Sequence, residues 1–271
     1  MKSVKKTWLA SVLALAIVLV LVGCSKKSEE TTSESQASNT AETKAAGTPV
    51  DKSTVGSVSG TVKFDGTKPK ATKIDMSQDP ACAKKGENTV ETYAGDGQSL
   101  ANVFVYVKSG ADKWAAETPT TPAVITQEGC RYHPHVLGVM VNQPVDIKNA
   151  DQTTHNIHPT PANNREWNES QPPGGADISK TFAREEIMLP VKCNQHPWMK
   201  MYINVVKNPW FAVTDDKGNY SIKDLPPGDY TLGFVHEKAG ETEQKVTIGA
   251  KEDKKGVDVT MKAGGGAAAG K

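Results

Sequence analysis

Short runs of alternating apolar residues fill most of this chain, and they restrict its fold more than any other feature. The runs are rich in Val, Ile, Tyr and Phe, and turn sequences such as Phe64-Asp65-Gly66 and Asp216-Lys217-Gly218-Asn219 separate them. Alternation at every second residue is typical of a strand with one buried face, and no long segment has the 3.6-residue period of a helix. We therefore predict an all-β fold built of sandwiches, with strands at 58–64, 101–107, 145–149, 187–193, 201–206, 219–222 and 229–235.

The N-terminus is typical of an export signal. Lys2, Lys5 and Lys6 precede an uncharged stretch at 8–22, which is shorter than the roughly 20 residues that a transmembrane helix needs and so disfavours an uncleaved anchor. The stretch ends in Leu21-Val22-Gly23-Cys24, which resembles the lipobox of bacterial lipoproteins. That resemblance implies removal of residues 1–23, a lipid on Cys24 and a periplasm-facing protein. The Ser that follows Cys24 favours the outer membrane over the inner one.

The two ends of the mature chain have compositions that do not build a core. Residues 24–56 are dominated by Ser, Thr, Glu, Lys and Ala, and we predict a flexible tether there. Residues 263–271 form a tail of Ala and Gly. The net charge of the whole chain is only +1, and no basic patch with interleaved aromatic residues occurs, which argues against a nucleic-acid partner.

The outer parts of the remaining chain share a signature that the middle lacks. An Asp-Lys-Gly turn at 216–218 is followed by Leu225-Pro226-Pro227-Gly228-Asp229-Tyr230, and the whole pattern resembles the carboxypeptidase regulatory-like, transthyretin-like β-sandwich. The resemblance implies a discontinuous accessory domain without catalysis, formed by 57–110 and 209–262. A separate domain at 111–208 would then be inserted into it.

The inserted segment contains a loop with three candidate metal ligands, Cys193-Asn194-Gln195-His196-Pro197-Trp198-Met199. In the strand before the loop, Cys193 falls on the same face as Ile187, Leu189 and Val191, so its thiol should point inward. Thr154-His155-Asn156-Ile157-His158, just after the strand at 145–149, supplies further imidazoles. Two histidines, one cysteine and a weak axial methionine are the ligands of a blue-copper site, whereas zinc rarely binds methionine.

The segment 136–206 resembles a cupredoxin of the amicyanin and plastocyanin type, with Trp198 where the amicyanin loop has Phe. The resemblance implies one type 1 copper ion, with Asn156 forming hydrogen bonds near the thiolate and His158 outside the ligand set. Plastocyanin spacing would select Met201 as the axial ligand, but Met201 begins a strand and is more simply core. The ligands that the resemblance implies are His155, Cys193, His196 and Met199.

The other cysteines and histidines have two interpretations. Cys82 can pair with Cys130 in a disulfide, which leaves Cys193 as the free thiol. Alternatively, His133 and His135 near Cys130 bind a second metal or shield the first.

The function implied by the cupredoxin resemblance is transfer of single electrons. The edge of His196 would be the electron port, and Pro197 and Trp198 would dock a redox partner such as a cytochrome or an oxidase. We predict no enzymatic activity, because Cys193 is not flanked by the histidines of multicopper oxidases and no Ser-His-Asp set or phosphate loop occurs. Copper delivery or storage, and surface adhesion or glycan binding by the accessory domain, remain as alternatives.

Overall fold

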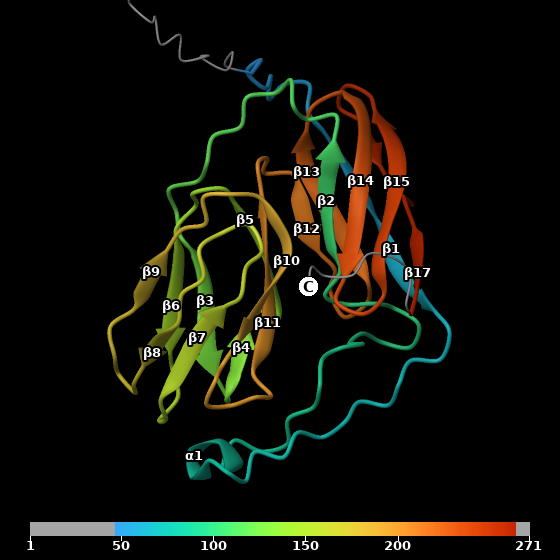
Figure 1. Ribbon diagram of the computed structural model, residues 1–271. Coiled ribbons are helices and arrows are strands. Elements are labelled where there is room, and N and C mark those ends of the chain that lie inside the picture. The colour runs from blue at the N-terminus through green and yellow to red at the C-terminus, as the bar shows by residue number, and fades with distance from the viewer. Residues whose placement is uncertain (1–46, 264–271) are drawn as a thin grey trace, which may run out of the picture. The chain divides into compact units, whose positions relative to one another are not determined.

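The computed structural model describes residues 47–263, in which all regular secondary structure is strand apart from one four-residue helix (Figure 1). The all-β prediction is confirmed, and each of the seven predicted strands falls on an observed one. The predicted signal, Cys24, most of the tether and the end of the tail lie outside the described residues. In chain order the elements are β1 (Gly56–Asp65), α1 (Pro80–Ala83), β2 (Phe104–Ser109), β3 (Ala123–Glu128), β4 (Arg131–His133), β5 (Val136–Met140), β6 (Val145–Asn149), β7 (His155–Pro159), β8 (Glu169–Gln171), β9 (Ile178–Lys180), β10 (Glu186–Lys192), β11 (Lys200–Val206), β12 (Phe211–Val213), β13 (Asn219–Leu225), β14 (Gly228–His236), β15 (Gly240–Ile248), β16 (Asp253–Lys254) and β17 (Val259–Lys262).

The first sandwich combines the N-terminal and C-terminal strands. One sheet has the order β13-β1-β16, with β17 also paired to β1, and the other has the order β12-β2-β14-β15. Between β13 and β14 the chain turns at Pro226-Pro227, and the Tyr230 hydroxyl donates to the Pro226 carbonyl at 2.7 Å, which fixes the turn. The side chains that fill this sandwich are fully or almost fully buried and include Val58, Val62, Leu100, Val103, Val105, Ile222, Leu232 and Phe234.

The second sandwich consists of the sheets β5-β11-β10-β7-β8 and β4-β3-β6-β9. β5 runs parallel to β11, and β3 runs parallel to β6, so long connections rather than hairpins join these pairs. Its core includes Ile125, Tyr132, Val139, Ile147, Ile157, Leu189, Val191, Met201, Ile203 and Val205. The alternating apolar residues of β10 and β11 therefore build this core, and Cys193 belongs to it.

A third apolar cluster joins residues of both sandwiches. Phe104, Tyr106 and Val235 come from β2 and β14, and they pack with Val136 and Val206 of β5 and β11. Gly138 in β5 lies so close to this cluster that a Cβ there would stand 2.6 Å from the Phe211 ring. The absence of a side chain at Gly138 is therefore required for this contact.

The connection between β1 and β2 departs from the predicted domain boundary. Residues 57–110 were assigned to the first sandwich, but Ile74, Met76 and Cys82 pack in the core of the second one. We call residues 74–92 the cap segment. Cys82 in α1 forms a disulfide with Cys130 next to β4, with an S–S distance of 2.03 Å, and this is the pairing expected from the sequence. The apolar side chains and the disulfide together hold the cap segment against the second sandwich.

The predicted tether extends less far along the chain than residue 56. Thr48 forms a backbone bridge with Trp114, and its amide donates to the Lys113 carbonyl at 2.8 Å. Val50 packs against the first core, and β1 already begins at Gly56. The prediction was wrong for 47–56, because a single apolar side chain and a backbone pairing suffice to dock a polar segment.

The predicted inward face of β10 is correct only for its second half. Leu189, Val191 and Cys193 are buried in the second core, but Ile187 packs against the third cluster instead. Met188 has a φ of 54°, and the pairing of β10 with β11 shifts register between Glu186 and Leu189. This bulge reverses the alternation, because an extra residue turns every preceding side chain to the other face.

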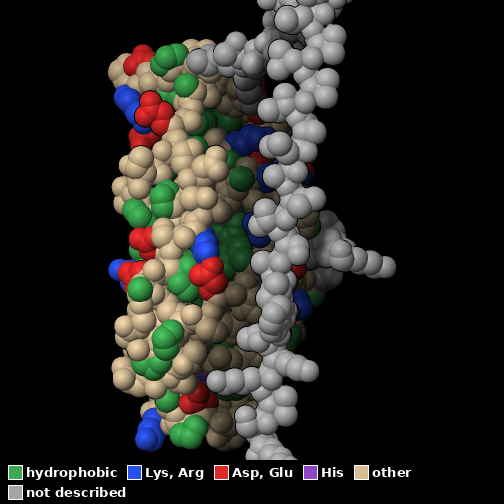
Figure 2. Space-filling model, turned by 60° about the vertical axis from the view of Figure 1, so that its left-hand side comes forward, with side chains coloured by type: hydrophobic (Ala, Val, Ile, Leu, Met, Phe, Trp, Pro, Cys, Tyr) green, Lys and Arg blue, Asp and Glu red, His purple; other side chains and the backbone are tan. Residues whose placement is uncertain are grey.

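Charged and apolar side chains are interspersed on the face of the molecule that Figure 2 shows. Among the described residues, only Val90 and Val124 are exposed large apolar side chains, at 44% and 43%. The described part of the chain contains no helix that is long and apolar enough to span a membrane.

Candidate metal centre

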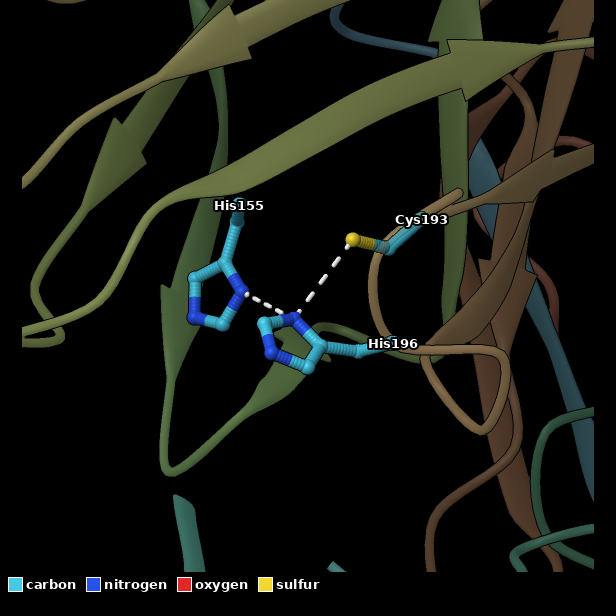
Figure 3. A group of neighbouring side chains, drawn as sticks. All are labelled: His155, Cys193 and His196. Atoms are coloured by element: carbon cyan, nitrogen blue, oxygen red, sulfur yellow. Dashed lines mark hydrogen bonds between the residues drawn. The ribbon is translucent and has the colours of Figure 1, made fainter. Parts of the chain in front are cut away.

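Two separate segments of the second sandwich bring three ligand atoms to one point. His155 begins β7, and Cys193 and His196 belong to the loop between β10 and β11 (Figure 3). The Nδ1 atoms of the two histidines lie 2.9 Å apart, and Cys193 Sγ lies 3.7 Å from His196 Nδ1. All three ligand atoms lie within 4.8 Å of one another. The structure therefore brings together three of the four predicted ligands through these atoms.

This cluster is shielded from solvent. His155 is 0% exposed, Cys193 2% and His196 4%. The loop that carries two of them is closed by backbone hydrogen bonds, from Cys193 N to the Met199 carbonyl at 3.2 Å and from Met199 N to the His196 carbonyl at 2.9 Å. A bound ion would therefore be held in a rigid and largely dry environment.

Two polar atoms of Asn156 contact the Cys193 thiol, as the cupredoxin resemblance implied. Its backbone N–H points at Cys193 Sγ at 3.5 Å, and its Oδ1 lies 3.3 Å from the same sulfur. The same Oδ1 accepts from the Asn194 amide at 2.7 Å, and Asn156 Nδ2 donates to Asn168 at 2.6 Å. Asn156 thus links β7, which carries His155, to the loop that carries Cys193.

The far side of the His155 ring faces a buried carboxylate. Nε2 of His155 donates to Asp151 Oδ2 at 3.0 Å, and Asp151 is 0% exposed. Burial acts to raise the pKa of Asp151, but Lys85, with its Nζ 2.8 Å from Oδ1, and the Cys130 amide outweigh this and hold that pKa below its ordinary value. The pKa of His155 is also lowered, chiefly by its own burial. Both shifts favour a neutral imidazole beside a charged carboxylate.

His196 has a corresponding partner in the cap segment. Its Nε2 lies 3.0 Å from Oδ2 of Asp79, and the Thr153 hydroxyl donates to the same oxygen at 2.7 Å. Oδ1 of Asp79 accepts from the amides of Ala81 and Cys82, so Asp79 is the N-cap of α1. Burial opposes ionisation, but the hydrogen bonds from Thr153 and His196 hold the pKa of Asp79 well below its ordinary value.

The two carboxylates determine where the ring protons lie. A carboxylate only accepts hydrogen bonds, so Nε2 of each histidine carries the hydrogen and each Nδ1 keeps its lone pair. Two such lone pairs 2.9 Å apart repel each other unless a proton or a cation lies near both. With the thiol of Cys193 beside them, these residues fit a copper ion, for which two imidazoles and a thiolate are a known donor set.

The two candidate axial ligands are both deeply buried. Met199 is 1% exposed and Met201 is 0% exposed. Met201 stands opposite Val191 in the pairing of β10 with β11, which is a regular core position. Met199 lies in the ligand loop itself, and its carbonyl closes that loop on Cys193. The choice of Met199 as axial ligand stays a prediction.

The exposed edge that was expected at His196 is absent from the described structure. Asp79 and α1 cover the Nε2 edge, and Cys82 Sγ lies 3.8 Å from this nitrogen. Trp198 is half-buried, and its Nε1 donates to the Cys130 carbonyl at 3.1 Å. The prediction of His196 as the open electron port is therefore wrong, because it assumed that no other segment covers the ligand loop.

The remaining predicted residues lie outside the cluster. His158 bonds Asn194 Oδ1 at 3.0 Å and Glu166 at 2.6 Å, so it braces the loop from outside. His133 is exposed, and its Nε2 lies 3.2 Å from the Glu128 carbonyl oxygen.

His135 bonds Glu237 at 2.8 Å. In the described residues, every group of side chains that could hold a metal includes His155 or His196. Two of these groups use Cys82 or Cys130, whose sulfurs are already joined to each other. A second metal bound by His133 and His135 is therefore not supported.

Sequence reasoning missed Asp79 and Asp151. Asp79 precedes Pro80, a pattern typical of a helix start, but nothing in that pattern points to a histidine 117 positions away. Asp151 follows β6 and precedes His155 by four residues, and this short spacing is the one signal that could have suggested the contact.

Comparison with known proteins gives partial likenesses. No protein family matches the sequence, and no curated protein does. Among solved structures, the chain resembles a copper-containing nitrite reductase (NirK) from Thermus scotoductus SA-01, with 22% identity over 38% of this chain and 25% of that one and a TM-score of 0.30. A purple cupredoxin from Nitrosopumilus maritimus has 23% identity over 31% of this chain and 98% of its own, with a TM-score of 0.27. An amicyanin mutant in its Cu(I) form has 19% identity over 37% of this chain and 97% of its own, with a TM-score of 0.28.

The chain spans about a quarter of the length of the nitrite reductase that it matches. Each likeness covers less than two fifths of the present chain, at 38%, 31% and 37%. The function is therefore inferred from the geometry of the site itself.

Proposed function

We propose that this protein carries one type 1 copper ion and transfers single electrons in the cell envelope. The observation that supports this most strongly is the convergence of His155 Nδ1, His196 Nδ1 and Cys193 Sγ within 4.8 Å of one another in a buried site. Met199 completes the proposed ligand set. A bound copper ion would supply a one-electron couple, and the protein would supply the geometry that both oxidation states share.

The residues around the site have separate roles in this proposal. Cys193 and the two imidazoles bind the ion, and the backbone N–H of Asn156, 3.5 Å from Sγ, donates to the thiolate. The closed loop from Cys193 to Met199 limits rearrangement when the charge of the site changes. Burial of the cluster excludes water, which would otherwise bind the metal and slow electron exchange.

Electrons would enter beside the covered imidazole. Trp198 has its ring centroid 5.1 Å from that of His196, and Pro197 next to it is exposed. A cleft of about 280 Å³ borders this part of the loop and is lined in part by Pro197, Trp198 and Tyr202. We propose this surface as the docking site of a redox protein such as a cytochrome or an oxidase.

The sequence near the N-terminus supports a placement at the membrane. A lipid on Cys24 would hold it at the membrane, facing the periplasm, and Ser25 favours the outer membrane. The first sandwich would then act as a rigid accessory module without catalysis. We propose no enzymatic role, because Cys193 is flanked by Lys192 and Asn194 and not by the histidines of multicopper oxidases.

Redox cycling tests this function against copper delivery. The chain from residue 25 onward, which lacks the predicted signal and Cys24, would be loaded with copper, reduced and reoxidised in the presence of a Cu(I) chelator. A carrier keeps its copper through repeated cycles and recovers its absorption each time. Loss of the ion to the chelator on the first reduction would contradict the carrier function and favour delivery.

A further inference from the structure

In both proposed ligand histidines, Nε2, the ring nitrogen on the side away from the metal site, contacts a carboxylate. His155 Nε2 meets Asp151 Oδ2 at 3.0 Å, and His196 Nε2 meets Asp79 Oδ2 at 3.0 Å. The two contacts have the same form, although one carboxylate follows β6 and the other caps α1. A ligand histidine whose second nitrogen is held in this way has a fixed ring orientation and a more basic metal-binding nitrogen.

Asp151 is fixed by contacts on both of its oxygens. Oδ2 also accepts from the Cys130 amide at 2.7 Å, while Oδ1 accepts from the Gly129 amide at 3.0 Å. Lys85 Nζ lies 2.8 Å from Oδ1, and its side chain is 34% exposed. The carboxylate therefore cannot turn away from His155, and one cation faces it from the solvent side.

Asp79 is fixed by the start of α1. Its Oδ1 accepts from the amides of Ala81 at 2.7 Å and Cys82 at 3.1 Å, and Thr153 donates to its Oδ2 at 2.7 Å. The disulfide from Cys82 to Cys130 attaches this turn to the second sandwich. The cap segment thus brings a second negative charge to the ligand set from a distant part of the chain.

We propose that Asp79 and Asp151 are positioning residues that set the reduction potential of the copper site, and that Lys85 moderates the effect of Asp151. This inference rests on the proposed function, because it concerns the same ion. Negative charge next to the ligand imidazoles stabilises Cu(II) more than Cu(I), and the interaction is strong where water is excluded. The two carboxylates lower the potential, and the Lys85 cation raises it.

The test uses variants that change charge and keep shape. Asp79→Asn and Asp151→Asn remove the charge and keep the volume, and the one accepting oxygen that remains in each can face either the imidazole or the backbone amides. Lys85→Gln removes the cation. Asp75→Asn is the matched control, because Asp75 is an exposed member of the cap segment whose Oδ1 accepts from the Ser77 amide at 2.9 Å and does not contact the ligand histidines.

The readout is the midpoint potential of each copper-loaded variant, measured together with its absorption spectrum. We expect at least a tenfold shift toward Cu(I) in Asp79→Asn and in Asp151→Asn, which is about 59 mV for one electron. Lys85→Gln shifts the equilibrium toward Cu(II), and Asp75→Asn leaves it unchanged. A role limited to folding would not produce opposite signs in Asp151→Asn and Lys85→Gln.

Two results would overturn the inference. If all variants keep the absorption of the parent and the same potential, the carboxylates do not set it, although the copper function stands. If Asp151→Asn and Lys85→Gln shift in the same direction, the effect is structural. Should Asp151→Asn fail to fold, the signs in Asp79→Asn and Lys85→Gln decide. Absence of a thiolate-to-copper band in the parent chain is a different result, because it refutes the proposed function itself.

Discussion

His196 and Asp79 stand 117 positions apart in the chain, and their side chains meet with 3.0 Å between Nε2 and Oδ2. The histidine belongs to the loop between β10 and β11, and the aspartate caps α1 in the cap segment. Cys82, in the same turn, is joined to Cys130 and brings its sulfur to 3.8 Å from the imidazole. A segment that precedes the second sandwich in sequence therefore closes its candidate copper site.

Replacement of Met199 and Met201 by Leu, one at a time, distinguishes the axial ligand from a core residue. We expect Met199→Leu to raise the reduction potential and alter the EPR signal, because the thioether would be lost from the ion. Met201→Leu should leave both unchanged and cost less than about 1.5 kcal/mol of stability, as expected for a swap of similar volume in a core. The reverse outcome would assign the axial position to Met201.

Removal of the disulfide should destabilise the protein and loosen the cap segment. Its 48-residue separation corresponds to about 4 kcal/mol in the chain-entropy model. We expect the Cys82→Ala, Cys130→Ala double variant to lose up to this amount in urea unfolding and to release bound copper faster to a chelator. Unchanged release from a folded double variant would show that Asp79 alone keeps the site closed.

Deprotonation of His135 should lower the stability of the folded protein at alkaline pH. Burial alone would lower its pKa, but its contacts with Glu237 and Glu91 raise the pKa to about 9 from an ordinary value of 6.5. The stabilisation, about 3 kcal/mol, is fully present below pH 6.5 and is lost as the pH rises through 9. Urea unfolding should show this loss in the parent and not in His135→Gln. The exposed His133 supplies the control, since His133→Gln should keep the parent profile.

His236 should instead lower the stability of the folded protein at acidic pH. It is 2% exposed, its Nδ1 accepts from the Ala239 amide at 3.0 Å, and burial lowers its pKa to about 4. The unfolded chain takes up a proton near pH 6.5 and the folded chain does not, so stability falls by roughly 3 kcal/mol between pH 6.5 and 4. His236→Asn keeps an acceptor for that amide and should flatten this part of the unfolding profile. An unchanged acid slope would mean that the carboxylates alone cause it.

The sequence predicted the parts of this fold that depend on local pattern. Alternation over Leu189, Val191 and Cys193 placed the thiol in the core correctly. The same pattern failed at Ile187, because Met188 adopts a left-handed backbone conformation that its residue type does not signal. A bulge of this kind depends on the pairing of β10 with β11, which is a tertiary property.

The candidate site likewise has residues that the sequence motifs identify and contacts that they do not. His155, Cys193 and His196 could be found, because their residue types occur in short motifs with a recognisable chemistry. The contacts of Asp79 and Asp151 could not be found by those motifs, since they arise only when the cap segment and the loop after β6 fold against the ligand rings. The covering of His196 escaped prediction for the same reason.

The spectrum of the copper-loaded chain tests the central claim most directly. Cu(II) would be added to the chain from residue 25 onward and, as a control, to the same chain with Cys193→Ala, followed by absorption and EPR measurements. We predict an intense band at roughly 600 nm with a small copper hyperfine splitting, both lost in the control, because they arise from the copper–thiolate bond. No such band, or a band that survives without the Cys193 thiol, would contradict the assignment of a type 1 copper site.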